Sequence, residues 1–188
     1  MVKTPSNMLP LGTRAPDFTL PEPATGDLVS LSDQRDKPVL VVFSCNHCPY
    51  VLHIINAFVE LANTEQRQGL GVFMISANDV TGYPQDGPEQ MAEFARDRGF
   101  KFPYLYDESQ QVARAYRAAC TPDFFLFDEK HRLVYRGQFD SSRPGNSEPV
   151  NGADLQAAID TVFAGDPPLD DQNPSVGCSI KWRAGNEP

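Results

Sequence analysis

The chain of 188 residues lacks any apolar run close to the ~20 residues that a transmembrane helix needs. Residues 1–16 contain no apolar block, so they do not have the pattern of a secretory signal. We therefore expect a cytoplasmic protein that does not associate with membranes.

Clusters of lysine and arginine are also missing, and the net charge is -9. Proteins that bind nucleic acids draw on such clusters to contact phosphates, so a nucleic-acid partner is excluded. The hydrophobic fraction of 40% is ordinary for a globular protein. The length predicts a single domain over residues 1–188, with a core at about residues 10–165 and a tail at residues 166–188.

Cysteine is scarce, with only Cys45, Cys48, Cys120 and Cys178 in the whole chain. Small secreted domains held together by disulfides carry many more cysteines for their length. In a cytosolic chain, a close pair such as Cys45 and Cys48 indicates a catalytic or metal-binding role.

Apolar periodicity predicts alternating strands and helices, followed by a strand hairpin and a final helix. Residues 39–43 are β-branched and apolar without interruption, which is typical of a strand buried on both faces of a sheet. The tail from Gly165 is expected to be irregular, although its apolar end at residues 178–182 should dock on the body. We expect an N-terminal hairpin within residues 17–31, strands at 39–43, 72–77, 123–127 and 133–137, helices opened by Pro49 and Pro88, and helices at 109–116 and 152–163.

The segment Cys45-Asn46-His47-Cys48 lies where the first buried strand gives way to a helix. Cysteines three residues apart at a helix start are close enough to form a disulfide reversibly. A helix N-terminus favours a thiolate, so we expect Cys45 to be the more acidic thiol and the nucleophile, with Cys48 as the resolving thiol. His47 would favour the thiolate further when it is protonated.

Two other interpretations of the pair compete with redox chemistry. The cysteines could be inert core residues, although the junction of a strand and a helix is a poor place to bury unreactive thiols. They could also join His47 or His53 in a zinc site, but a structural zinc takes four ligands and the sequence has no second close pair. We therefore expect no metal and no organic cofactor, since the cysteines themselves carry the electrons.

Three segments carry a resemblance to a known family: FSCNHCPY at residues 43–50, TPDFFLFD at 121–128 and GCSIKW at 177–182. The chain resembles the thioredoxin superfamily, and more narrowly a peroxiredoxin-like branch of the alkyl hydroperoxide reductase and thiol-specific antioxidant type. The resemblance implies a thioredoxin-like α/β fold, with a central mixed sheet flanked by helices, an N-terminal hairpin extension and an irregular C-terminal tail.

The resemblance also assigns roles to Thr121 and Pro122, which modulate the pair together with His47. Pro122 would be the cis-proline that faces the cysteines and lines the substrate groove. Peroxiredoxins place their peroxide-reducing cysteine at the position of Cys48, together with an arginine on a facing strand. Here Thr121-Pro122 stands where that arginine is expected, which argues against efficient peroxidase activity.

The other two cysteines are secondary candidates. Cys120 precedes Pro122 by two residues and would approach the pair if its loop faces the helix, or it is a small buried apolar residue. Cys178 could resolve Cys45 or Cys48 from the tail, or it packs beside Trp182.

These observations favour a thiol–disulfide oxidoreductase with an antioxidant role, working through a mixed disulfide of the Cys45–Cys48 pair. Its expected partners are a protein disulfide, small disulfide or peroxide and a thiol reductant. The alternatives are a peroxiredoxin-like thiol peroxidase and a non-catalytic binding module with a thioredoxin fold.

Overall fold

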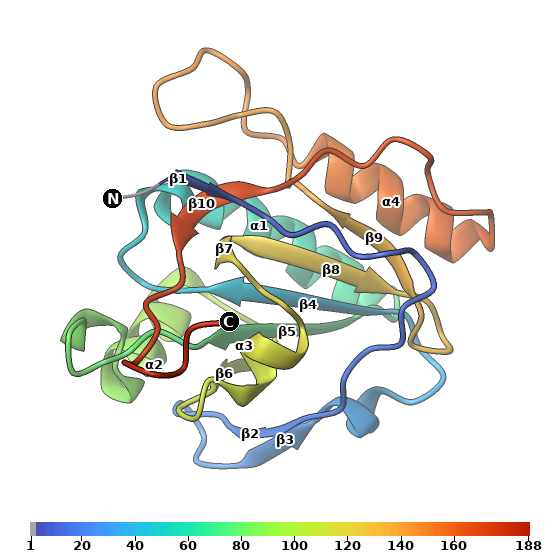
Figure 1. The fold of residues 1–188 in the computed structure, drawn as a ribbon. Helices are drawn as coiled ribbons and strands as arrows, with labels where there is room; N and C mark the ends of the chain where they lie inside the picture. Colours follow the sequence, from blue (N-terminus) through green and yellow to red (C-terminus); the bar gives the residue numbers. More distant parts are fainter. Residues whose placement is uncertain (1–2) are drawn as a thin grey trace.

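A computed structural model describes residues 3–188 and has a five-stranded mixed sheet at its centre (Figure 1). The strands follow the order β6-β5-β4-β8-β9, with β4 in the middle. β4 pairs in parallel with β5 and antiparallel with β8, which confirms the predicted mixed sheet. The strands of this sheet are β4 (Val39–Ser44), β5 (Gly71–Ser76), β6 (Tyr104–Tyr106), β8 (Asp123–Phe127) and β9 (Leu133–Gly137).

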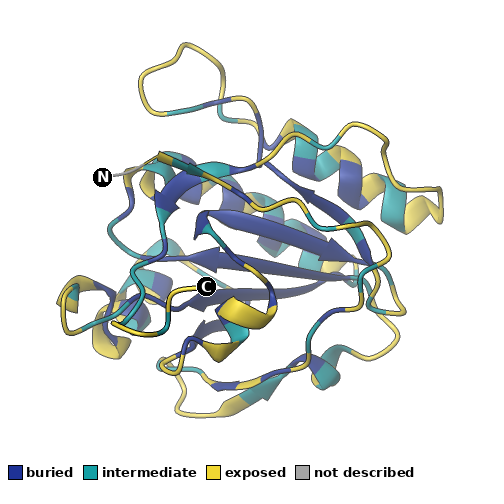
Figure 2. Cartoon of the chain, viewed as in Figure 1, coloured by how far each residue is buried: buried dark blue, intermediate teal, exposed yellow. Residues whose placement is uncertain are grey.

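Both faces of this sheet are buried, which explains the uninterrupted apolar sequence of β4 (Figure 2). Leu40 and Val42 belong to one apolar cluster, with the helices α1, α2 and α4. Val41 and Phe43 belong to a second cluster on the other face, with α3 and the N-terminal segment. The helices are α1 (Pro49–Arg67), α2 (Pro88–Arg98), α3 (Gln111–Ala115) and α4 (Ala153–Ala164).

The N-terminal hairpin is confirmed as β2 (Thr19–Pro21) and β3 (Leu28–Ser30), which pair antiparallel. Within residues 3–188 no helix is both long and apolar enough to cross a membrane.

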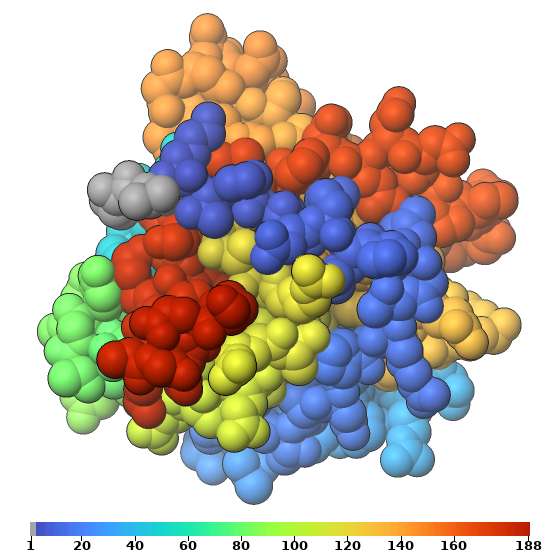
Figure 3. Space-filling view, viewed as in Figure 1, coloured from blue at the N-terminus to red at the C-terminus, as the bar shows by residue number. Residues whose placement is uncertain are grey.

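The prediction of an irregular C-terminal tail is wrong for residues 176–179. They form β10 (Val176–Ser179), which lies between β1 (Lys3–Pro5) and β7 (Cys120–Thr121) in a second antiparallel sheet. β10 is too short to show strand periodicity, and its partners come from distant parts of the chain. The predicted docking of the tail is confirmed, and Figure 3 shows the C-terminal segment in red packed against the N-terminal segment and the body.

Candidate active site

Cys45 and Cys48 lie between the end of β4 and the start of α1, at the carboxyl edge of the central strand. Cys48 is the N-cap residue of α1, and Pro49 is the first helical residue. Proline is tolerated there because a backbone N–H at this position would have no acceptor within the helix. Both side chains are at most 1% exposed. The junction therefore places two buried thiols at a helix N-terminus, where free amide groups favour negative charge.

The segment before β8 covers this pair, and its peptide bond between Thr121 and Pro122 is cis, as the resemblance implied. The Thr121 hydroxyl lies 3.5 Å from Sγ of Cys45. The thiol of Cys48, when protonated, donates to the Thr121 carbonyl oxygen at 3.1 Å. Thr121 thus contacts both sulfur atoms and holds the pair between α1 and β7.

The two thiols differ strongly in acidity. A hydrogen bond from Cys45, followed by bonds from Cys178, the Val51 amide and Thr121, lowers the pKa of Cys48 to about 5 against the effect of burial. The same bond to Cys48, burial and the charge of Asp86 raise the pKa of Cys45 well above its ordinary value. Cys48 is therefore the thiol of the pair that ionises more easily, and Cys45 holds its proton more firmly.

This order is the reverse of the prediction that Cys45 is the more acidic thiol. The physical reason is the position of the helix start. Because α1 begins at Pro49, Cys48 is its N-cap residue, and the backbone amide of Val51 in the first turn helps to lower the pKa of Cys48. Cys45 lies four residues before Pro49, the first residue of the helix, and is close to the carboxylate of Asp86 instead.

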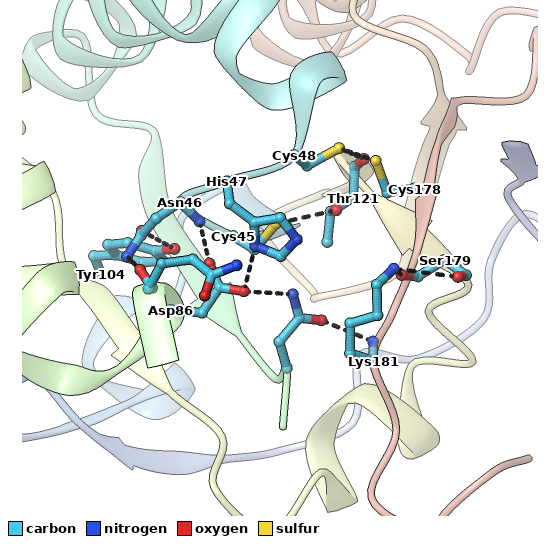
Figure 4. A network of polar contacts seen from close by, with 12 residues as sticks. Cys45, Asn46, His47, Cys48, Asp86, Tyr104, Thr121, Cys178, Ser179 and Lys181 are labelled. Carbon is cyan, nitrogen blue, oxygen red and sulfur yellow. Dashed lines mark hydrogen bonds and ion pairs between the residues drawn. The ribbon is translucent and has the colours of Figure 1, made fainter. Parts of the chain in front are cut away.

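Asp86 organises the two residues between the cysteines, as Figure 4 shows. One carboxylate oxygen accepts the Asn46 amide at 2.8 Å, and the other lies 2.7 Å from Nδ1 of His47. The second oxygen also accepts the Asn78 side-chain amide at 2.8 Å. Asp86 is fully buried at the end of a short 3-10 helix (Pro84–Asp86). The sequence analysis did not identify Asp86, because in the sequence it is an ordinary polar residue of a loop.

The ring of His47 stacks on Tyr83 at a centroid distance of 5.3 Å and an interplanar angle of 9°. Lys181 also contacts Tyr83, and its Nζ lies 5.7 Å from the centroid of the tyrosine ring. The Lys181 amide donates to Asn78, which in turn donates to Asp86. The C-terminal segment is therefore part of the environment of His47.

Cys178 of β10 is the third thiol of the site. Its Sγ lies 2.6 Å from Sγ of Cys48, and its side chain is buried. Burial and the hydrogen bond to Cys48 raise the pKa of Cys178 to about 12. The structure thus brings Cys45 and Cys178 together around Cys48. Cys178 belongs to the same apolar cluster as these cysteines, whereas Trp182 packs against the other cluster.

Cys120 is the cysteine that the structure sets apart from this cluster. Its thiol donates to the Pro122 carbonyl at 3.6 Å, and burial raises its pKa well above the ordinary value. Arg136 forms a buried ion pair with Asp123 at 3.2 Å and stacks on Phe125. No arginine contacts Cys48 through a hydrogen bond or ion pair that the structure gives for residues 3–188.

A metal could in principle be held by Cys45, His47 and Asp86, whose ligand atoms lie within 4.8 Å of one another. These are three ligands, whereas a structural zinc takes four. Both carboxylate oxygens of Asp86 already accept hydrogen bonds. The arrangement is equally that of a histidine held by a carboxylate next to a thiol, which suits proton transfer.

Comparison with known proteins connects this geometry with a family. The model of the AhpC/TSA family matches residues 11–136. A crystal structure of an uncharacterised conserved protein from Geobacillus kaustophilus is 48% identical, with a TM-score of 0.95 and 97% of each chain covered.

Two named relatives point to two related activities. A Mycobacterium tuberculosis protein named as a peroxiredoxin is 35% identical over 61% of this chain and 68% of its own length. The thiol-disulfide oxidoreductase ResA of Geobacillus kaustophilus is 30% identical over 67% of this chain and 68% of its own length.

Proposed function

This chain belongs to the AhpC/TSA family, in the peroxiredoxin-like branch of the thioredoxin superfamily, and from that premise we propose a thiol–disulfide oxidoreductase that works through Cys45 and Cys48. The observation that carries the proposal is the placement of two buried thiols at the start of α1, where Thr121 contacts both sulfur atoms. A thiolate attacks a disulfide, and a neighbouring thiol then completes the exchange.

In the first step the Cys48 thiolate attacks one sulfur of a substrate disulfide. A bond forms between Cys48 and that sulfur, the substrate S–S bond breaks, and one substrate thiolate leaves. The mixed disulfide removes the negative charge from Cys48. The hydrogen bond to Cys48, which is the largest cause of the raised pKa of Cys45, is lost at the same time, so Cys45 becomes easier to ionise.

In the second step Cys45 gives up its proton and attacks Sγ of Cys48, and the second substrate thiolate leaves. The reduced pair supplies two electrons and the proton of Cys45, and a second proton comes from the solvent, so the substrate disulfide becomes two thiols and the enzyme holds a Cys45–Cys48 disulfide. His47 lies close to Cys45 and is fixed by Asp86, so it is placed to accept the proton of Cys45. A thiol reductant then restores the reduced pair.

The test follows the two thiols by mass spectrometry. Trypsin releases both cysteines in one peptide, residues 36–67, because the bond from Lys37 to Pro38 resists cleavage. Reduced protein treated with oxidised glutathione is expected to form a disulfide inside this peptide. Cys48→Ser is expected to form no disulfide within this peptide and to lose reduction of insulin disulfides, while Cys120→Ser is expected to form the disulfide and to reduce insulin. Wild-type protein whose two thiols both stay open to alkylation would contradict the proposal.

A thiol peroxidase is the second candidate, because the charge lies on Cys48, the position that peroxiredoxins use. The Cys48 thiolate would attack one peroxide oxygen, the O–O bond would break, and a sulfenic acid and an alcohol or water would result. Condensation with Cys45 would release water and give the same disulfide. Peroxide consumption at a rate comparable to disulfide reduction would favour this candidate, and peroxide consumption near the uncatalysed rate would exclude it.

The proposed partners are a protein or small-molecule disulfide, or a peroxide, together with a thiol reductant. We also place the protein in the cytoplasm, where thiol reductants keep cysteines reduced. An antioxidant role would follow from the removal of disulfides or peroxides.

A further inference from the structure

The register of β10 sets Cys178 opposite Thr121, the residue that contacts both sulfur atoms of the pair. This pairing brings Sγ of Cys178 to 2.6 Å from Sγ of Cys48. A covalent S–S bond is about 2.05 Å long, so bond formation needs a movement of only a fraction of an ångström.

β10 is fixed in this register from both sides. A methyl group built on Gly177 would overlap the backbone of Thr121, so only glycine allows the two strands to approach this closely. Before β10, the Ser175 hydroxyl donates to the Pro122 carbonyl at 2.7 Å. After it, the Lys181 amide donates to Asn78 at 2.8 Å. The strand therefore lies over the thiols as a cover, and Figure 4 shows Cys178 directly facing Cys48.

We propose that Cys178 is a second resolving thiol, so that Cys48 exchanges between a disulfide with Cys45 and a disulfide with Cys178. This inference rests on the proposed function, which supplies the substrate disulfide as oxidant. After Cys48 has formed the mixed disulfide, Cys178 gives up its proton and attacks Sγ of Cys48. The substrate thiolate leaves and takes up a proton, and a Cys48–Cys178 disulfide remains.

The charge of Cys48 controls when Cys178 can act. Two of the causes that raise the pKa of Cys178, its hydrogen bond to Cys48 and the charge of Cys48, disappear once Cys48 is in a disulfide. The third thiol is thus held protonated before the substrate binds and is released for attack afterwards. Cys45 can then attack Cys48, return Cys178 to the thiol form and close the Cys45–Cys48 disulfide without any net change in electrons.

The second disulfide would also change access to the site. It joins β10 covalently to the start of α1, at a point where Cys45, Cys48 and Cys178 are already buried. A substrate can reach Cys48 only when β10 moves away. The Cys48–Cys178 form is therefore the closed form of the enzyme, and attack by Cys45 reopens it.

The experiment uses the full chain and its tryptic peptides. Cys178 lies in the peptide 137–181, because the bond from Arg143 to Pro144 resists trypsin, and Cys120 lies in the peptide 118–130. Reduced Cys45→Ser is treated with one equivalent of oxidised glutathione, and the remaining thiols are then alkylated. We expect a disulfide between peptides 36–67 and 137–181, with only a transient glutathione adduct. Cys45→Ser/Cys178→Ser is expected to keep glutathione on Cys48, whereas Cys45→Ser/Cys120→Ser should cross-link as well as Cys45→Ser does.

A stable glutathione adduct on Cys48 in Cys45→Ser, with Cys178 open to alkylation, would overturn the inference. The proposed function would survive that result if wild-type protein still forms the disulfide within peptide 36–67. Conversely, a cross-link in Cys45→Ser without that internal disulfide in wild type would leave Cys178 as the resolving thiol and remove Cys45 from the mechanism. Circular dichroism of each variant shows whether it is folded before oxidation.

Discussion

Nδ1 of His47 lies 2.7 Å from Oδ2 of Asp86, a carboxylate that is fully buried. The same carboxylate raises the pKa of Cys45 by its charge. Asp86 thus has two effects on the site, because it positions the histidine and opposes ionisation of the neighbouring thiol.

Replacing this carboxylate by an amide, in Asp86→Asn, should lower the pKa of Cys45 and destabilise the fold. The loss of charged hydrogen bonds in a buried site is expected to cost about 2 kcal/mol. Urea unfolding gives the free energy, and the pH dependence of alkylation at Cys45 in Cys48→Ser and Cys48→Ser/Asp86→Asn shows the change in acidity. Asp97→Asn removes the same charge from an exposed position and should leave both properties unchanged. An unchanged alkylation profile would show that Asp86 does not influence Cys45.

Titration of the reduced protein should reveal a thiolate near pH 5, because the pKa of Cys48 is lowered to about 5. Thiolate absorbance in the ultraviolet measures this step, and Cys48→Ser should remove it while Cys120→Ser should not. A first step near the ordinary thiol pKa of about 8.5 would contradict the assigned charge.

The same pKa shift predicts how stability depends on pH. The unfolded thiol titrates near pH 8.5, above the folded value of about 5, so the unfolded state binds more protons between these values. The contribution of Cys48 is fully present above about pH 8.5 and is lost as the pH falls toward 5. As the pH falls from about 8.5 to about 5, the free energy of unfolding of wild type should therefore decrease relative to that of Cys48→Ser. Urea unfolding at several pH values measures this difference. Parallel profiles of the two proteins would speak against a shifted Cys48.

Gly177→Ala should separate β10 from β7, because the added methyl group meets the Thr121 backbone. Overpacking of this kind typically costs about 1–3 kcal/mol. We expect a comparable loss in urea unfolding, and a several-fold lower yield of the Cys48–Cys178 cross-link in the Cys45→Ser background. Gly82→Ala, where the added methyl would make only an ordinary contact, is the control. An unchanged cross-link yield would mean that the register of β10 does not position Cys178.

Arg136→Met should strongly destabilise the protein, because it leaves Asp123 buried without its cation. Breaking a buried ion pair from one side costs about 3–5 kcal/mol. The exposed pair of Arg96 and Asp97 offers a control, and Arg96→Met should change the stability by less than about 1 kcal/mol. Equal effects of the two substitutions would show that burial does not determine how much the Arg136–Asp123 pair contributes to stability.

The sequence predicted the central elements well because their signals are local. β8 and β9 match the predicted residues 123–127 and 133–137, and α1 begins at Pro49 as expected. β10 was missed because a strand of four residues has no periodicity to detect, and its pairing with β1 and β7 depends on contacts between distant segments.

The sequence likewise predicted only those residues of the candidate site whose signals are local. Spacing and resemblance identified four of these residues, which are Cys45, Cys48, His47 and Pro122. Asp86 could not, since its role depends on the loop between β5 and α2 folding back onto Asn46. The order of thiol acidity also differed from the prediction, because it depends on the contact between Cys45 and Cys48 and on the charge of Asp86, which the sequence does not place near Cys45.

The proposed function requires that Cys45 and Cys48 cycle between a dithiol and a disulfide. Redox titration of the purified protein in glutathione buffers, with mass spectrometry of the alkylated peptide 36–67 at each potential, tests it most directly. We expect an internal disulfide in this peptide that forms and is reduced near the cellular poise. Thiols that stay unpaired at every potential would contradict it and favour a binding module in which the cysteines are incidental.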